Sequence, residues 1–124
     1  MRLLLDTQVY IWWRRAPGEL SRSTLHAIEH ANDVVVSTVS CLEIGIKQSV
    51  GKLVDEPALL DDPSEHNLEQ LPVSWAHARE LRLLPLLHRD PFDRLLVAQA
   101  RVERRTLVTS DAQVRAYDVA SMPA

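Results

Sequence analysis

Acidic residues recur at places in this chain where several carboxylates could act together. Asp6 directly follows the apolar run LLL, and Asp111 directly follows TLVTS; Glu43 lies within SCLEIGIKQ, and Asp93 within HRDPFDRLLVAQA. Carboxylates cannot share one small site as bare anions, because like charges drive each other's pKa values upward. A divalent cation with oxygen ligands would relieve this repulsion. It could also activate water and stabilise the charge of a phosphoryl transition state.

Each of these acids also has a purely structural interpretation. Asp6 and Asp111 could cap the helices that follow them, a role that aspartate performs well. Glu43 could be a solvated helix position that pairs with Lys47 one turn later, which stabilises a helix by a few tenths of a kcal/mol. Local rules do not decide between the two interpretations.

The segment HRDPFDR poses the same question for two aspartates. Asp90 suits the cap of a helix whose first residue is Pro91. Asp93 would then be the third helical residue, where it could reach back to the cap and complement the helix dipole. His88 is interpreted as a loop histidine, with contact to a substrate phosphate as the alternative.

Short strands alternating with helices must position these acids. Runs of apolar or β-branched residues at 3–6, 33–38 and 106–111 predict buried strands, and 68–73 and 118–122 are weaker candidates. Helices are predicted at 7–15, 21–31, 40–53, 74–84 and 91–105, and residues 54–67 read as a loop. This alternation predicts an α/β fold around a mainly parallel sheet.

Parallel topology would bring the acids together. Ligands of such folds bind beyond the carboxyl ends of the strands. Asp6 and Asp111 are therefore expected at one rim of the sheet, with Glu43 and Asp93 in the first turns of helices that start near it. In the segment 40–53, one apolar face is formed by Leu42, Ile46, Val50 and Leu53.

Composition sets limits on the class of protein. The 124 residues are 46% hydrophobic and 25% charged, which predicts one globular domain spanning 1–124. The net charge of −3 gives no overall basic field, although a local patch could still bind nucleic acid. The lone Cys41 rules out an internal disulfide framework and is expected to be a buried structural thiol. We expect a cytoplasmic protein without a signal peptide or membrane span.

Two other classes with acids at strand ends fit less well. A phospho-accepting signalling domain would need an acidic pair at the first strand's end and a lysine on a late strand, but Thr7 follows Asp6 and TLVTSD has no lysine. An aspartate-nucleophile phosphatase would need an acid at position 8, where Gln8 stands. Glycine-rich phosphate-binding loops are also absent from the sequence, which has three glycines.

Taken in order, the motifs LLLDT, SxxEI, DPFDRLLVAQA and LVTSD resemble those of the PIN-domain ribonucleases, and most of all the VapC-type toxins of bacterial toxin–antitoxin systems. The resemblance implies a three-layer α/β/α sandwich that cleaves RNA with Mg²⁺ or Mn²⁺ and inhibits growth or translation. It places the catalytic and metal-binding roles on Asp6, Glu43, Asp93 and Asp111. Asp90 lies beside this set and is ranked below Asp93 as a metal ligand.

The same resemblance implies substrate contacts and partners. Basic or hydroxyl side chains are expected to hold the RNA around the acidic centre, the candidates being Arg14, Arg15, Lys47, Lys52, Arg89, Arg94 and Thr109. VapC-type toxins form homodimers and are inhibited by a VapB-like antitoxin. Tyr10, Trp12 and Trp13 could belong to either interface or to the core. The alternative function is a non-catalytic PIN module that binds RNA or protein.

Overall fold

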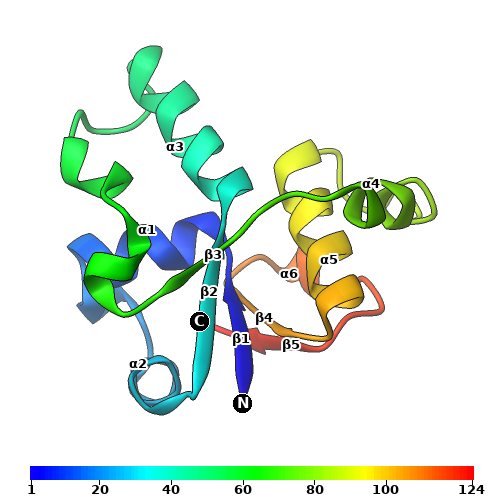
Figure 1. Ribbon diagram of the computed structural model, residues 1–124, viewed down its shortest axis with the longest axis horizontal. Coiled ribbons are helices and arrows are strands. Elements are labelled where there is room, and N and C mark those ends of the chain that lie inside the picture. Colours follow the sequence, from blue (N-terminus) through cyan, green and yellow to red (C-terminus); the bar gives the residue numbers. More distant parts are fainter.

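A computed structural model describes residues 1–124 and has a five-stranded sheet with the order β3-β2-β1-β4-β5 (Figure 1). Every neighbouring pair of strands is parallel. The strands are β1 (Arg2–Leu5), β2 (Asp33–Ser37), β3 (Glu69–Leu71), β4 (Thr106–Thr109) and β5 (Ser121–Pro123). The predicted parallel sheet is therefore confirmed.

Helices cover both faces of the sheet. They are α1 (Thr7–Arg15), α2 (Arg22–His30), α3 (Thr38–Ser49), α4 (Trp75–Leu81), α5 (Pro91–Glu103) and α6 (Ala112–Arg115), with the short 3₁₀ helices η1 (Pro17–Glu19), η2 (Pro57–Leu60) and η3 (Pro63–His66). Figure 1 shows α1 and α2 on one side of the sheet and α4 and α5 on the other, so the fold is the predicted α/β/α sandwich. None of the helices combines the length and the apolar character that a membrane crossing requires.

The central strand β1 contributes to two separate cores. Leu3 and Leu5 are fully buried in the cluster shared with α1 and α2, whereas Leu4 is fully buried in the cluster shared with α5 and α6. This division follows from the alternation of side chains along a strand. Tyr10 of α1 is buried in the first cluster, and Trp12 and Trp13 pack against it half-buried.

The helix predicted at 40–53 begins earlier and ends earlier than expected. The Ser37 hydroxyl accepts the Val39 N–H at 3.0 Å and caps α3 at the end of β2. The helix stops at Ser49, and Gly51 adopts a positive φ of 75°, a conformation that glycine adopts without steric cost. The helix therefore leaves the sheet immediately and rises beyond its carboxyl end (Figure 1).

The apolar face of this helix is not its buried face, contrary to expectation. Leu42, Ile46 and Val50 are 58%, 45% and 61% exposed. The buried positions of α3 are instead Val39, Ser40, Glu43 and Ile44. The reason lies in the tertiary packing. Helix α3 contacts α1 and α5 beyond the end of the sheet, so the side of α3 that faces these two helices is the buried one. Cys41 lies outside the buried side and is exposed, so its predicted burial was also wrong.

Other boundaries shift by a few residues. The strand predicted at 68–73 is reduced to β3, which ends just before Pro72, a residue without a backbone N–H. The strand predicted at 118–122 is β5, displaced towards the C-terminus. The helix predicted at 74–84 ends at Leu81. Within 54–67 the chain forms η2 and η3.

Candidate functional site

The four predicted acids converge at the carboxyl end of the sheet. They line one cavity of about 190 Å³. This cavity is bordered by Asp6, Thr7, Gln8, Ile11, Glu43, Lys47, Asp90, Asp93, Ser110 and Asp111. Its walls are almost entirely polar, as expected for a site that binds an ion or a phosphate rather than an apolar ligand.

Asp6 and Asp111 occupy equivalent positions after neighbouring strands. Asp6 caps α1, with its Oδ1 accepting the Val9 N–H at 2.8 Å. Asp111 caps α6, with its Oδ1 accepting the Gln113 N–H at 2.8 Å. Both residues therefore cap a helix and also border the cavity, because a cap at a strand–helix junction lies at the rim of the sheet.

Glu43 reaches the cavity from α3 and is 5% exposed. Its Oε2 lies 2.7 Å from the Lys47 Nζ, as the i,i+4 spacing predicted. Its Oε1 is buried and has no hydrogen-bond partner. A buried carboxylate oxygen without a donor is costly to maintain, and a bound cation would satisfy it.

The two aspartates of HRDPFDR have different environments. Asp90 caps α5, with its Oδ1 accepting the Phe92 N–H at 2.9 Å. Asp93 lies in the first turn of α5 and borders the cavity, where its Oδ2 is 3.1 Å from the His88 Nε2. Asp93 does not reach back to the cap, because His88 holds its carboxylate on the cavity side.

Burial and mutual repulsion alter the ionisation of the acids. Burial, together with nearby Glu43 and Asp111, raises the pKa of Asp6 to about 6 against the opposing hydrogen bonds from Thr109 and Val9. Burial and the charge of Asp90 raise the pKa of Asp93 to about 7. Two carboxylates of this site therefore bind protons at higher pH than ordinary aspartates do, and a positive charge nearby would favour their ionised forms.

The pKa of Asp111 moves in the opposite direction. Burial alone would raise it, but the hydrogen bonds from His88 and from the backbone N–H groups of Gln113 and Val114 outweigh burial and lower the pKa. Hydrogen bonds from within the protein therefore favour the ionised form of Asp111.

The donor set fits a hard divalent cation. All four acids offer carboxylate oxygens, which such cations prefer. The orphaned Oε1 of Glu43 and the raised pKa values of Asp6 and Asp93 are the features expected of an ion site whose positive charge the protein does not itself supply. Asp6, Glu43 and Asp93 are the residues that would hold the ion, with Asp111 beside them.

His88 lies in a loop, as expected from the sequence, but its contact with the acids of the cavity was not predicted. Its Nε2 lies 3.0 Å from the Asp111 Oδ2 and 3.1 Å from the Asp93 Oδ2. The signal available in the sequence was its position two residues before the cap of α5, but nothing local indicated that the ring would turn towards β4.

Of the residues predicted to contact substrate, only Lys47 lines this cavity. The Arg94 guanidinium donates to the Leu84 carbonyl at 3.2 Å and so supports the loop before α5. Arg89 and Lys52 are exposed and lie outside the cavity lining. Thr109 is fully buried, and its Oγ1 accepts the Asp111 N–H at 3.1 Å.

The remaining two arginines are engaged elsewhere. Arg14 bonds the Ala58 carbonyl at 2.9 Å and lies 3.8 Å from Asp61, and Arg15 forms an ion pair with Glu56. Both therefore tie α1 to the segment that contains η2.

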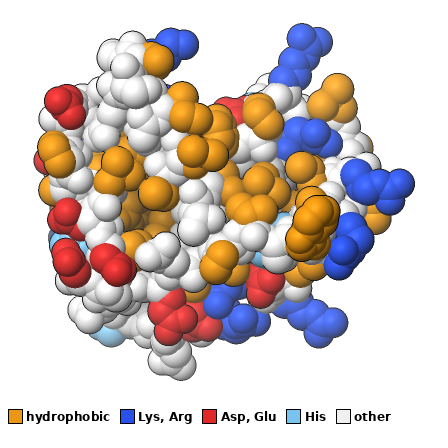
Figure 2. Space-filling model, turned by 45° about the horizontal axis from the view of Figure 1, so that its top comes forward, with side chains coloured by type: hydrophobic (Ala, Val, Ile, Leu, Met, Phe, Trp, Pro, Cys, Tyr) orange, Lys and Arg blue, Asp and Glu red, His pale blue; other side chains and the backbone are white.

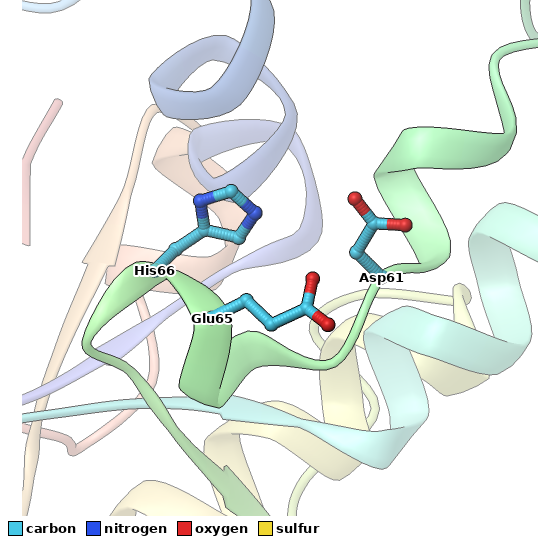
Figure 3. Close-up of side chains that lie close together, drawn as sticks. All are labelled: Asp61, Glu65 and His66. Atoms are coloured by element: carbon cyan, nitrogen blue, oxygen red, sulfur yellow. The ribbon is translucent and has the colours of Figure 1, made fainter.

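A second group of potential metal ligands lies at η3. Figure 3 shows the carboxylates of Asp61 and Glu65 lying near each other, with His66 on the same short helix as Glu65. Both carboxylates are exposed. Its two carboxylates therefore lack the burial of Asp6 and Glu43 and are open to hydration, although the Nε2 of His66 is buried and has no hydrogen-bond partner.

Comparison with known proteins gives consistent findings. Residues 3–120 match the family model of the PIN domain. The chain is 29% identical over 119 residues to Ribonuclease VapC22 of Mycobacterium tuberculosis (strain ATCC 25618 / H37Rv), which covers 93% of this chain and 91% of that protein.

Solved structures share the fold. The structure of VapBC2 from Rickettsia felis bound to a promoter DNA fragment matches with a TM-score of 0.76 and 17% identity, over 100% of this chain and 99% of that chain. VapBC-5 from Mycobacterium tuberculosis, a member of the VapBC family of toxin–antitoxin systems, matches with a TM-score of 0.65 and 20% identity, over 99% and 98% of the two chains. These likenesses confirm the fold.

Proposed function

Because the chain belongs to the PIN domain family, we propose that it is a Mg²⁺- or Mn²⁺-dependent endoribonuclease and the toxin of a toxin–antitoxin pair. The observation that carries this proposal is the convergence of four acids on one polar cavity, where burial raises the pKa values of Asp6 and Asp93. The similarity to a protein named as a ribonuclease supports the choice of RNA as substrate.

The environments of the acids suggest a different role for each of them. Asp6, Glu43 and Asp93 would hold the cation: each borders the cavity, Asp6 and Glu43 are buried, and the charge of Asp90 acts on Asp93. Asp111 completes the site, and Asp90 serves mainly as the cap of α5. A bound divalent cation would lower the pKa of water and stabilise the charge that develops on a phosphodiester during hydrolysis. Thr109 orients Asp6 and Asp111 through its hydroxyl group.

Basic side chains near the rim guide the RNA backbone to the acids. Lys47 lies in the cavity wall, and its hydrogen bond to Glu43 raises its pKa, so it stays charged. Figure 2 shows Lys and Arg side chains mainly on the right of the face, the side of α4 and α5, whereas acidic side chains dominate the left edge. We therefore assign Arg89, which precedes α5, as an outer phosphate contact; the exposed Lys52, which follows α3, is assigned the same role on the other side of the cavity.

A second copy of the chain and a VapB-like antitoxin are the proposed protein partners. Leu42, Ile46 and Val50 form an exposed apolar stripe along α3, which a dimer would cover. Hydrophobic side chains also gather across the middle of the face in Figure 2. Light scattering should give the mass of a dimer for the wild type and of a monomer for Ile46→Glu; a monomeric wild type would refute the dimer.

The enzymatic proposal is tested by incubating total cellular RNA with the protein in Mn²⁺, in Mg²⁺ and in excess EDTA. We expect cleavage with either ion, none with EDTA, and a loss of at least 100-fold in rate for Asp93→Asn. Asp118→Asn is the matched control, because Asp118 is fully exposed and far from the cavity lining. Equal, metal-independent cleavage by wild type and Asp93→Asn would reject the mechanism, and no cleavage by any form would favour a non-catalytic binding module.

A further inference from the structure

The imidazole of His88 bridges two acids that come from different parts of the fold. Its Nε2 lies 3.1 Å from the Asp93 Oδ2 on α5 and 3.0 Å from the Asp111 Oδ2 after β4. The side chain of His88 is 14% exposed, so these contacts are largely shielded from water. The contact to Asp111 is a hydrogen bond, and the Asp93 carboxylate lies within ion-pair distance of the same nitrogen.

The other ring nitrogen shows which tautomer is present. Nδ1 accepts a hydrogen bond from the Asp90 backbone N–H at 3.1 Å, so Nδ1 carries a lone pair in this arrangement. The proton of the neutral ring then resides on Nε2, which donates to the Asp111 Oδ2, while the Asp93 Oδ2 lies within ion-pair distance of the same nitrogen. A nitrogen that carries a proton has no lone pair for a metal. His88 is therefore a donor to the acids and not an additional metal ligand.

The backbone that carries His88 is held in place independently. The N–H groups of Leu87 and His88 both donate to the Tyr117 hydroxyl, at 3.1 and 3.0 Å. Tyr117 is 4% exposed and packs in the core cluster beneath α5. The position of the ring is therefore determined by the fold before any ligand arrives.

The contacts leave one oxygen of Asp93, but neither oxygen of Asp111, without a donor. In Asp111, Oδ1 accepts the Gln113 N–H and Oδ2 faces His88, so both oxygens already have donors. In Asp93, Oδ2 faces His88, which leaves Oδ1 for a cation. A donor on one carboxylate oxygen fixes the direction of the other, as hydrogen bonds to metal-binding carboxylates commonly do.

From this geometry we propose that His88 is a positioning residue of the metal site: its Nε2–H bonds the Asp111 carboxylate, and its ring lies against the Asp93 carboxylate, which keeps the two acids at a fixed separation. The inference rests on the proposed function, because it assumes that these acids bind a divalent cation. His88 is thereby added to the four acids as a residue of the site, and its expected effect is on the affinity for the metal ion.

Calorimetric titration with Mn²⁺ and with Ni²⁺ tests the role of His88. We expect His88→Ala to weaken Mn²⁺ binding about tenfold, the lower end of the range for lost orienting partners of metal ligands. His88→Gln should recover most of the affinity, because its amide nitrogen reaches about as far as Nε2. His88→Asn is the matched control: its amide reaches only the position of Nδ1, and the affinity should stay low. Thermal unfolding of each variant without metal verifies that it folds.

Four outcomes would overturn the assignment. Unchanged or tighter Mn²⁺ binding by a folded His88→Ala variant would show that the ring does not preorganise the acids. A much larger loss for Ni²⁺ than for Mn²⁺ would show that His88 is itself a ligand, since imidazole favours Ni²⁺. Equal affinities of the Gln and Asn variants would mean that the reach of the donor is irrelevant. Wild type that binds no divalent cation would refute the metal-dependent function as well.

Discussion

Aspartates at the two ends of the parallel sheet have pKa values that are shifted in opposite directions. At the amino end, Asp33 of β2 receives the Arg105 guanidinium at 2.8 and 3.2 Å and Arg2 of the neighbouring strand at 3.4 Å. The hydrogen bond from Arg105, with the charge of both arginines, lowers the pKa of Asp33. At the carboxyl end, the cavity acids crowd together, and burial raises the pKa of Asp93 to about 7.

The difference shows which end stabilises the fold and which end is available for a ligand. The ion pair at the amino end links three segments of the chain and leaves its acid ionised at neutral pH. The carboxyl end holds acids whose charges the protein compensates incompletely, with Lys47 and His88 as the polar partners nearby. Such uncompensated charge is unfavourable without a ligand, and it is also what gives a cation its binding energy.

Stabilisation by a bound metal ion should differ more between variants at the two ends of the sheet than any other property. Mn²⁺ at 100 times its Kd should stabilise the wild type by about 2.7 kcal/mol, raising Tm by several degrees. Asp33→Asn should keep this shift in full, although its Tm without metal is lower. Asp93→Asn should lose most of it, because a direct ligand is gone. Differential scanning fluorimetry with and without Mn²⁺ measures both; an undiminished shift in Asp93→Asn would place the ion elsewhere.

The pH dependence of metal affinity is the next largest effect. Asp6 and Asp93, with pKa values of about 6 and 7, must release protons when the cation binds. Protons compete at low pH, so Mn²⁺ affinity should rise roughly 20-fold between pH 6 and pH 8 and then level off. Calorimetry across this range tests the prediction. An affinity that does not change with pH would mean that these acids are already ionised.

Stability without metal should change in opposite directions at the two ends. The pKa of Asp93 is raised on folding, so its contribution to stability declines as pH rises towards 7. Asp93→Asn should therefore stabilise the protein by about 1 kcal/mol at pH 8, after allowing for partial exposure to water, and by little at pH 5.

Asp33 shows the converse behaviour. Its lowered pKa contributes stability that is present above its unfolded pKa and is lost as pH falls through its folded pKa. Asp33→Asn should destabilise by about 1 kcal/mol at pH 8, because Arg105 is buried and loses its partner. Urea unfolding in EDTA at both pH values measures these changes, and the same sign for both variants at pH 8 would contradict the contrast between the two ends.

Local chemistry explains which features could be predicted from the sequence. Asp6, Asp90 and Asp111 each cap a helix through a backbone N–H two or three residues away, so the residue type and its neighbours are enough to predict them. The apolar runs that form β1, β2 and β4 are recognisable for the same reason. Strand order then places Asp6 and Asp111 at the same rim.

Long-range packing explains what the sequence could not show. Leu42, Ile46 and Val50 form a regular apolar stripe, yet α1 and α5 enclose the other side of α3 and bury Glu43. A helical pattern describes how side chains are distributed around an axis, but only the neighbouring helices determine which side faces inwards.

The sequence by itself determined the kinds of element, their order and the acids that cap or border them, because these depend on contacts within a few residues. Only the tertiary structure decided that His88 turns its Nε2 to Asp93 and Asp111 while Arg94 supports the loop at Leu84. The backbone N–H of His88 is bound by a tyrosine hydroxyl 29 residues later in the chain, at Tyr117. A contact over that separation leaves no local pattern, since it depends on the folding of every element between the two residues.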